Sequence, residues 1–482
     1  MFKGKEMNDV SAVLEIFKAL NGIPRPSHHE GEAAEWLCSF AERNGLEHSR
    51  DSNDCVVIRK PATEGYECHE TVVILNHMDM VCVANQGVPF HPETSTIESY
   101  VQDGWMKAKG TSLGADNGIG LSMALAVLQS DDIPHPALEV LTTTNEEDGM
   151  SGASGLSPDF IKGRKVLNLD SEDYDTITVG AAGAYLQIHR IPFENIPVPD
   201  GFSFFSFIIE GGLGGHSGVD INKGRANANK LLFNFLNRVK NQMEIVVSSV
   251  SGGQANASIP SSASVVFGVP DNKRNDLLET ASLFAVELHT NFSITDPGLH
   301  ADVTEIFNNP EHVIDAKAAD KLLSSIEKVP CGVIEPENCN STVTPFTSNN
   351  IGVIKIEDGF ISVSTHTRSF SVKAMEELGE RIKEAFGSDS TLVMSAPAWR
   401  EDRDSKYISM VSDVFEDILG FTPKKVEMHF VLEAGYYVEK YPGIQIASIG
   451  PRIVCPHSTK ERVEMSTVEN IWQVVKEVLK RL

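Results

Sequence analysis

The sequence lacks the features that mark membrane-spanning, secreted and disulfide-bonded proteins. Its longest uncharged apolar run, residues 202–209, is far shorter than the roughly 18 residues that a membrane-spanning helix needs. Residues 1–10 contain no apolar segment of the kind found in a signal peptide. The seven cysteines are scattered and form no Cys-x-x-Cys pair, which disfavours a disulfide framework and a thiolate zinc site. We therefore expect a cytoplasmic protein in which any metal is bound by histidine and carboxylate side chains.

Two nucleotide-binding motifs are also absent. Gly118 and Gly120 do not begin a dinucleotide-binding G-x-G-x-x-G motif, because Met123 occupies the place of the third glycine. No phosphate-binding G-x-x-x-x-G-K-S/T loop occurs. The sequence therefore gives no support to a nucleotide-dependent activity.

Basic residues are in the minority, with 41 Lys and Arg against 67 Asp and Glu and a net charge of −26. No cluster of basic residues offsets this charge, so neither nucleic acid nor an anionic membrane is expected as a partner. Part of the acidic excess is available for metal binding, although a net charge of this kind also serves solubility alone.

A chain of 482 residues is expected to form two or three domains, since single cores rarely exceed about 300 residues. Short β-branched strands first alternate with helical segments, which indicates an α/β domain with a mostly parallel sheet. The pattern changes at a proline-rich connection around residues 192–199 and returns after Pro397. We predict an α/β domain of residues 1–185 and 396–482, interrupted by an inserted α+β domain of residues 186–395.

Polar clusters follow several of the predicted strands. These clusters are residues 76–79 after the strand at 71–75, residues 146–148 after 137–144, residues 170–173 after 165–169, and residues 456–458 beyond the strand at 445–449. A fifth cluster, residues 114–118, precedes a predicted helix. Because ligands bind beyond the carboxyl ends of parallel strands, we expect the clusters to meet at one edge of the sheet.

Each cluster taken alone has a structural explanation. Acidic residues after a strand commonly cap a helix, a single histidine at a strand end is often a packing residue, and paired glutamates are often a solvated charge pair. Brought together, Asp116, Glu146, Glu147 and Asp170 would repel one another. Histidines among carboxylates suit zinc or a similar divalent cation. Two such cations would balance Asp116, Glu147, Asp170 and one hydroxide, which leaves Glu146 free to act as a general base.

Five segments resemble the signature segments of the cocatalytic dizinc peptidases and deacylases. They are residues 76–81, 110–118, 144–150, 170–172 and 456–458, with further similarity at 214–218, 227–230 and 432–435. Within that superfamily the chain is most similar to the bacterial aminoacyl-histidine dipeptidases, the peptidase D or carnosinase-like group. The resemblance implies a phosphorylase/hydrolase-like zinc-peptidase catalytic domain with an inserted lid domain. It also implies hydrolysis of dipeptides, including Xaa-His and carnosine-like substrates.

The resemblance further implies two bound divalent cations, zinc in the first place, with manganese and cobalt as alternatives. Asp116 matches the carboxylate that bridges both ions. His77 and Asp170 match the other ligands of one ion, and Glu147 and His457 match those of the second.

Five more residues match positions that act on the substrate or its surroundings. Glu146 matches the general base, and Asp79 matches the residue that orients the imidazole of His77. In the insert, His216 matches the histidine that stabilises the oxyanion. Arg368 resembles the residue that binds the terminal carboxylate of the substrate, with help from Asn256.

Other functions stay open on the sequence alone. A tripeptidase, a carboxypeptidase or an N-deacylase would share the metal site, and a non-catalytic binding protein could keep the fold but would not need Glu146. A homodimer is usual among relatives with a lid. The chain departs from the family pattern at Asn76, Cys455 and residues 460–462, which we interpret as affecting substrate preference, with Cys455 in a buried packing role.

Overall fold

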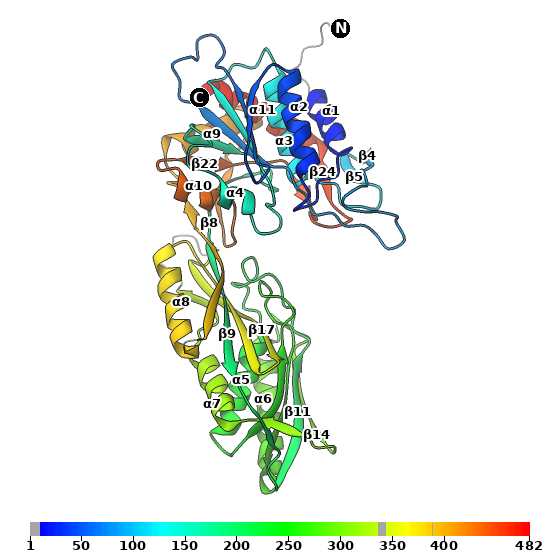
Figure 1. The fold of residues 1–482 in the computed structure, drawn as a ribbon, viewed down its shortest axis with the longest axis vertical. Coiled ribbons are helices and arrows are strands. Elements are labelled where there is room, and N and C mark those ends of the chain that lie inside the picture. The colour runs from blue at the N-terminus through cyan, green and yellow to red at the C-terminus, as the bar shows by residue number, and fades with distance from the viewer. Residues whose placement is uncertain (1–9, 336–343, 388) are drawn as a thin grey trace. The chain divides into compact units, whose positions relative to one another are not determined.

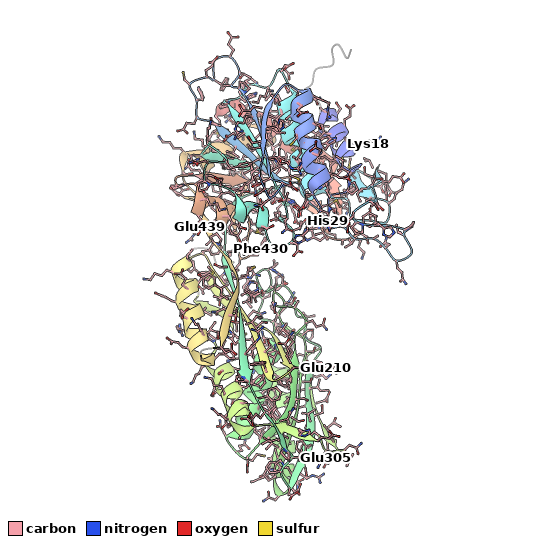
Figure 2. All side chains as sticks on the ribbon, viewed as in Figure 1. Lys18, His29, Glu210, Glu305, Phe430 and Glu439 are labelled. Carbon is pink, nitrogen blue, oxygen red and sulfur yellow. The ribbon has the colours of Figure 1, made fainter. Side chains whose placement is uncertain are left out.

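The computed structural model describes residues 10–335, 344–387 and 389–482 (Figure 1). Residues 1–9, for which the sequence predicts no signal peptide, and Cys339 lie outside the described part. The chain forms two compact units. The first comprises the chain up to Gly180 together with Trp399–Glu427 and Glu433–Leu482, and the second comprises Ala181–Ala398 and Met428–Leu432. No predicted boundary included the short segment 428–432, whose Phe430 is labelled in Figure 2.

The first unit is built around a nine-stranded sheet. In spatial order its strands are β1 (Glu47–Arg50), β2 (Val56–Lys60), β6 (Leu138–Thr143), β3 (Val72–His77), β7 (Lys165–Asn168), β22 (Gln445–Ser448), β8 (Thr176–Ala181) and β20 (Trp399–Arg400), with β21 (Lys424–Met428) beside β8. The central strands β6, β3, β7 and β22 are parallel. The pairs β1–β2 and β2–β6 are antiparallel, so the sheet is mixed. Every residue of β3 and β6 is buried, which is typical of parallel strands covered on both faces.

Seven helices lie in the described part of this unit. They are α1 (Ser11–Leu20), α2 (Gly31–Arg43), α3 (Ala115–Gln129), α4 (Ser151–Gly155), α9 (Lys406–Leu419), α10 (Ala434–Lys440) and α11 (Met465–Arg481). A small sheet joins β23 (Ile453–Val454), β24 (Arg462–Glu464), β5 (Trp105–Ala108) and β4 (Ser99–Gln102). Helix α3 is buried almost all round, whereas α1 and α11 bury one apolar stripe. Within the described residues, no helix combines the length and apolar character required to cross a membrane.

The second unit is an α+β structure with a nine-stranded sheet. In spatial order the strands are β14 (His300–Ile306), β11 (Phe202–Glu210), β13 (Ala263–Pro270), β12 (Val246–Gly252), β17 (Thr347–Glu357), β18 (Phe360–Ser369), β9 (Gly183–Pro192) and β19 (Ser390–Ala396), with β16 (Gly332–Glu335) beside β17. The strands pair antiparallel throughout. Helices α5 (Ala228–Lys240), α6 (Arg274–Phe292), α7 (Ala316–Lys328) and α8 (Val372–Phe386) pack against it. Strands β10 (Asn195–Pro197) and β15 (His312–Ile314) form a separate pair.

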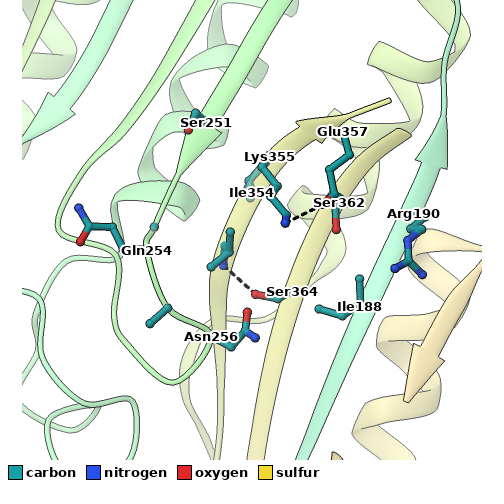
Figure 3. Close-up of a pocket in the computed structure, with 13 residues that line it drawn as sticks. Ile188, Arg190, Ser251, Gln254, Asn256, Ile354, Lys355, Glu357, Ser362 and Ser364 are labelled. Atoms are coloured by element: carbon teal, nitrogen blue, oxygen red, sulfur yellow. Dashed lines mark hydrogen bonds and ion pairs between the residues drawn. The ribbon is translucent and has the colours of Figure 1, made fainter. Parts of the chain in front are cut away.

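The second unit also contains a pocket of ≈ 520 Å³ (Figure 3). Its lining comes from β9, β12, β17, β18 and the loop after β12, and includes Arg190, Asn256 and Lys355. A salt bridge of 2.6 Å joins Lys355 to Glu357 at its wall.

The fold class predicted from the sequence, an α/β protein with an α+β insert, is confirmed. The sequence pattern also predicts helices over 118–129, 372–386 and 405–419, which correspond to α3, α8 and α9. The sheet of the first unit is less uniformly parallel than predicted, because its outer strands return antiparallel beside the parallel centre.

Close packing of α3 depends on Gly120. A Cβ atom at this position would lie 2.2 Å from the carbonyl oxygen of Leu169, the residue that precedes Asp170. We expect Gly120→Ala to lower the free energy of unfolding by about 1–3 kcal/mol, because backbone would have to move. Gly31→Ala is the matched control, since its nearest neighbouring atom is 3.8 Å away, and it should be neutral or slightly stabilising. Urea unfolding of both variants checks this, and equal stabilities would contradict it.

Candidate functional site

The polar clusters predicted to meet at one edge of the first unit's sheet do so. His77 is the last residue of β3, Asp116 lies in the first turn of α3, and Asp170 follows β7. Glu147 lies beyond the end of β6, and His457 lies in the loop between β23 and β24. Parallel β3, β6 and β7 end at the same edge, which explains why segments distant in sequence converge there.

These five residues form two groups that share one member. Suitable donor atoms of His77, Asp116 and Asp170 lie within 4.8 Å of one another, as do those of Asp116, Glu147 and His457. The two oxygens of Asp116 face different histidines. Oδ1 lies 3.1 Å from Nε2 of His77, and Oδ2 lies 3.2 Å from Nε2 of His457. This is the arrangement that a carboxylate needs in order to bridge two cations.

The remaining distances complete the two groups. Oδ1 of Asp170 lies 3.3 Å from Nε2 of His77, and Asn117 donates a hydrogen bond of 2.8 Å to the same oxygen. Oε2 of Glu147 lies 2.8 Å from Nε2 of His457, while its Oε1 is buried without a hydrogen-bond partner in the described residues. An unpaired buried carboxylate oxygen beside imidazole nitrogens fits a divalent cation that accepts nitrogen and oxygen ligands.

The pKa values of the clustered side chains show how strongly their charges interact. Burial and the charges of Asp116 and Glu147 raise the pKa of Asp170 to about 6, although His77 opposes the rise. Hydrogen bonds that the His457 ring donates to Asp116 and Glu147 raise the pKa of His457 to about 11. Burial first, and the charge of Asp116 next, raise the pKa of Glu172 to about 8. These shifts show that the side chains of the two groups crowd negative charge into a small, largely buried space.

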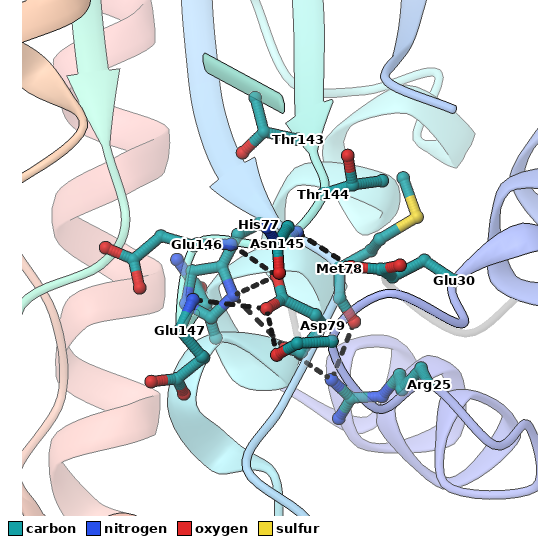
Figure 4. Close-up of polar contacts among 12 residues, drawn as sticks. Arg25, Glu30, His77, Met78, Asp79, Thr143, Thr144, Asn145, Glu146 and Glu147 are labelled. Carbon is teal, nitrogen blue, oxygen red and sulfur yellow. Dashed lines mark hydrogen bonds and ion pairs between the residues drawn. The ribbon is translucent and has the colours of Figure 1, made fainter. Parts of the chain in front are cut away.

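Asp79 connects two of the converging segments (Figure 4). Its carboxylate lies 3.3 Å from Nδ1 of His77 and accepts hydrogen bonds from the backbone N–H groups of Glu146 (3.0 Å) and Glu147 (3.1 Å). Ser27 donates a further hydrogen bond of 2.8 Å. Burial alone would raise the pKa of Asp79, but the hydrogen bond and charge of His77 bring it below the usual value. A carboxylate in this position can hold a proton on Nδ1 of a neutral His77 ring, which would leave Nε2 available to a cation.

Glu146 lies beside the two groups but belongs to neither. Burial raises the pKa of Glu146 well above its usual value. The negative charges of Asp170, Glu433 and Glu147 raise it further, whereas the charge of His77 lowers it. A carboxyl group with a raised pKa can both accept and return a proton near neutral pH.

The second unit holds the other predicted site residues. His216 lies in the loop between β11 and α5, and its Nδ1 accepts backbone hydrogen bonds from Gly218 (3.3 Å) and Val219 (3.2 Å). The proton of the neutral ring therefore lies on Nε2, which is a donor. Burial and the charge of Arg368 lower the pKa of His216 to about 4, so the ring is neutral at pH 7.

Arg368 on β18 is 3 % exposed, and its guanidinium contacts Ser217 Oγ at 3.4 and 3.5 Å. Within the described residues it forms no salt bridge with a carboxylate. Burial lowers its pKa to about 10. A buried cation without a carboxylate is suited to binding an anionic group. Asn256, which is predicted to assist Arg368, lies in the loop after β12, where its carbonyl oxygen accepts a 3.4 Å hydrogen bond from Asn350.

Several residues near the site were missed in the sequence. Glu433 accepts hydrogen bonds from Thr143 (2.8 Å) and Tyr437 (3.2 Å), and burial is the main cause that raises its pKa to about 8. Its segment matched the family pattern, but nothing in that match indicated contact with the end of β6. The neutral side chains of His366 and His429 lie near Arg368. Burial lowers the pKa of both histidines, and the charge of Arg368 lowers it further.

One interpretation of the loop around His457 needs correction. Cys455 is exposed, so a buried packing role is wrong. Glu461, one of the residues that depart from the family pattern, is 3 % exposed and accepts backbone hydrogen bonds from residues 113–116. A buried carboxylate that binds backbone more than three hundred residues away leaves no local signal in the sequence.

Comparison with known proteins identifies the class. The model of the peptidase family M20/M25/M40 matches residues 73–481. The cytosol non-specific dipeptidase of Escherichia coli K12 is 32 % identical over 475 residues, which is 97 % of each chain. The crystal structure of aminoacylhistidine dipeptidase from Vibrio alginolyticus superposes with a TM-score of 0.91 at 31 % identity, over 99 % of this chain and 98 % of that one. This chain belongs to the M20/M25/M40 peptidase family.

More distant structures share the fold. A tripeptidase from Staphylococcus aureus superposes with a TM-score of 0.61 at 15 % identity, over 98 % of this chain and 99 % of that one. The M20 family consists of metal-dependent peptidases, and the two residue groups that share Asp116 fit a pair of cations.

The role of Asp79 can be tested by Asp79→Asn. The amide would direct an N–H group at one of the two backbone donors and would no longer fix the proton of His77, so we expect divalent-cation affinity to fall about 10–100-fold. Titration of the metal-free protein with zinc measures this. Ser27→Ala removes only the hydroxyl donor to Asp79 and should stay within about threefold of wild type; equal affinities for all three proteins would contradict the assignment.

Proposed function

We propose that this protein is a cytoplasmic, metal-dependent dipeptidase that hydrolyses Xaa-His and related dipeptides. It would use two divalent cations, for which zinc is the first candidate. The observation that carries this proposal is the position of Asp116, whose two oxygens face the histidines of two separate ligand groups. Two relatives that match over nearly the full length, a non-specific dipeptidase and an aminoacylhistidine dipeptidase, support a dipeptide substrate.

The first unit would provide the catalytic residues. His77, Asp116 and Asp170 would hold one cation, and Asp116, Glu147 and His457 would hold the other. Such a pair of cations, when bound, lowers the pKa of water and polarises the scissile carbonyl. Glu146 would accept a proton from the attacking water and deliver it to the leaving amine. Asp79 would keep the ring of His77 and the backbone of Glu146 in place throughout.

The second unit, which we assign as the lid domain, would bind and stabilise the substrate. The Nε2–H of His216 would donate to the carbonyl oxygen as negative charge develops on it. Arg368 would bind the free carboxylate of the dipeptide, and Asn256 would assist. The absence of a carboxylate beside this buried guanidinium in the described residues supports that role.

The substrate class can be tested with a panel of peptides. We expect cleavage of β-alanyl-histidine and of other Xaa-His and Xaa-Xaa dipeptides, loss of cleavage after chelation, and recovery when zinc, manganese or cobalt is added. Ninhydrin or chromatographic assay of the released amino acids measures the rates. Recovered cleavage of tripeptides or N-acyl amino acids alone would replace the dipeptidase with another activity of the family. A folded, metal-loaded protein that cleaves none of these would overturn the proposal.

The general base can be tested by Glu146→Gln. The amide cannot accept the proton, so we expect kcat to fall about 10²–10⁴-fold while two cations remain bound. Asp148→Asn is the matched control, because Asp148 lies in the same acidic run with a side chain that is 76 % exposed. Steady-state kinetics and metal analysis of both variants check this. Full activity of Glu146→Gln would assign the base elsewhere.

A further inference from the structure

We propose that Glu461 is a positioning residue of the metal centre, which fixes the backbone that carries Asp116 relative to the loop that carries His457. This inference rests on the proposed function only in that the residues named above bind divalent cations. Glu461 itself provides no ligand atom in either group.

The carboxylate of Glu461 receives four consecutive backbone N–H groups. Oε2 accepts hydrogen bonds from Leu113 (2.7 Å) and Gly114 (3.0 Å). Oε1 accepts from Ala115 (2.8 Å) and, at the longer distance of 3.5 Å, from Asp116. Leu113 and Gly114 directly precede α3, and Ala115 and Asp116 are its first two residues. Helix α3 has no side-chain cap of its own, so Glu461 takes the place of a cap from 345 residues away.

The backbone of Glu461 lies in the same loop as His457. Glu461 follows His457 by one turn of chain, and its backbone N–H donates to the carbonyl oxygen of Ser458 at 3.1 Å. A shift of the Glu461 carboxylate therefore moves either the loop of His457 or the backbone of Asp116. His457 and Asp116 both belong to the second ligand group, in which Nε2 of His457 lies 3.2 Å from Oδ2 of Asp116.

Arg25 holds the opposite side of this backbone. Its buried guanidinium donates to the carbonyl oxygens of Gly114 (2.8 Å), Met78 (3.0 Å) and Asp79 (3.3 Å). The space is filled so closely that a Cβ atom on Gly114 would lie 2.6 Å from the guanidinium. Arg25 therefore joins this backbone to the segment after His77. Two buried charged groups, Arg25 and Glu461, thus hold the backbone at Asp116 from opposite sides.

The test measures cation affinity without any peptide. Metal-free protein is titrated with zinc, and separately with manganese, in competition with a chromophoric chelator. We expect Glu461→Gln to bind each cation about 10–100-fold more weakly, because its amide turns an N–H group toward two of the backbone donors.

Glu139→Gln provides the matched control. Glu139 is 2 % exposed and accepts backbone hydrogen bonds from Lys162 (2.7 Å) and Gly163 (2.9 Å), but it lies at the end of β6 opposite to Glu147. We expect both variants to unfold at lower temperature in the metal-free state, and only Glu461→Gln to lose affinity. Equal losses of thermal stability with wild-type affinity in Glu461→Gln would overturn the inference and leave Glu461 a purely structural residue.

A shorter carboxylate covers the case in which Glu461→Gln does not fold. Glu461→Asp keeps the charge but lacks one methylene group, so we expect a smaller loss of affinity in the same direction, and wild-type affinity would overturn the inference. Failure of the proposed function is distinguished by the wild-type protein. If it binds two cations but cleaves no peptide, the activity assignment fails while the comparison of affinities still decides the role of Glu461.

Discussion

Repulsion among carboxylates at the carboxyl ends of β3, β6 and β7 is the constraint around which the first unit is organised. Asp116, Glu146, Glu147 and Asp170 are brought together in a largely desolvated space, where burial and neighbouring negative charges raise the pKa values of Glu146, Glu147 and Asp170. A fold that gathers so much negative charge loses stability unless a positive charge or a proton accompanies it. The donor geometry about Asp116 provides for the positive charge in the form of cations.

The surroundings of the site hold this unfavourable arrangement in place. Asp79 and Glu461 are themselves buried carboxylates, but they differ from the ligand groups because backbone N–H donors surround them. Hydrogen bonds to an ionised carboxylate are among the stronger ones in proteins and offset part of the cost of burial. The site therefore contains two kinds of carboxylate, those satisfied by backbone and those left for a metal. The difference lies in partners rather than in residue type.

Features with a local signal in the sequence could be predicted better than features that depend on long-range packing. His77, Glu147 and Asp170 could be placed together because they lie at or beyond the carboxyl ends of the parallel strands β3, β6 and β7, whose common direction carries them to one edge. Helix α8 was predicted with its observed bounds, since its apolar period and its Ser371 cap are local signals. The roles of the site residues stay predictions, because geometry shows proximity and not chemistry.

Features that depend on long-range packing could not be predicted from local sequence patterns. The antiparallel outer strands, the return of residues 428–432 to the second unit and the burial of Glu461 all depend on partners far along the chain. Acidic residues between basic ones, as at 460–462, resemble an exposed surface when only neighbours in sequence are considered. Nothing short of the folded backbone distinguishes Glu461 from a solvated glutamate.

The separation of the site residues along the chain has a consequence for biosynthesis. His457 and Asp116 face each other across 341 residues, and the main part of the second unit, Ala181–Ala398, lies between them. While a ribosome is producing that intervening part, the earlier segments already carry His77 and three carboxylates without the loop that completes the second ligand group. Under the proposed function, cation binding by the complete set would join the early and late parts of a discontinuous domain, and it would link metal supply to the completion of folding.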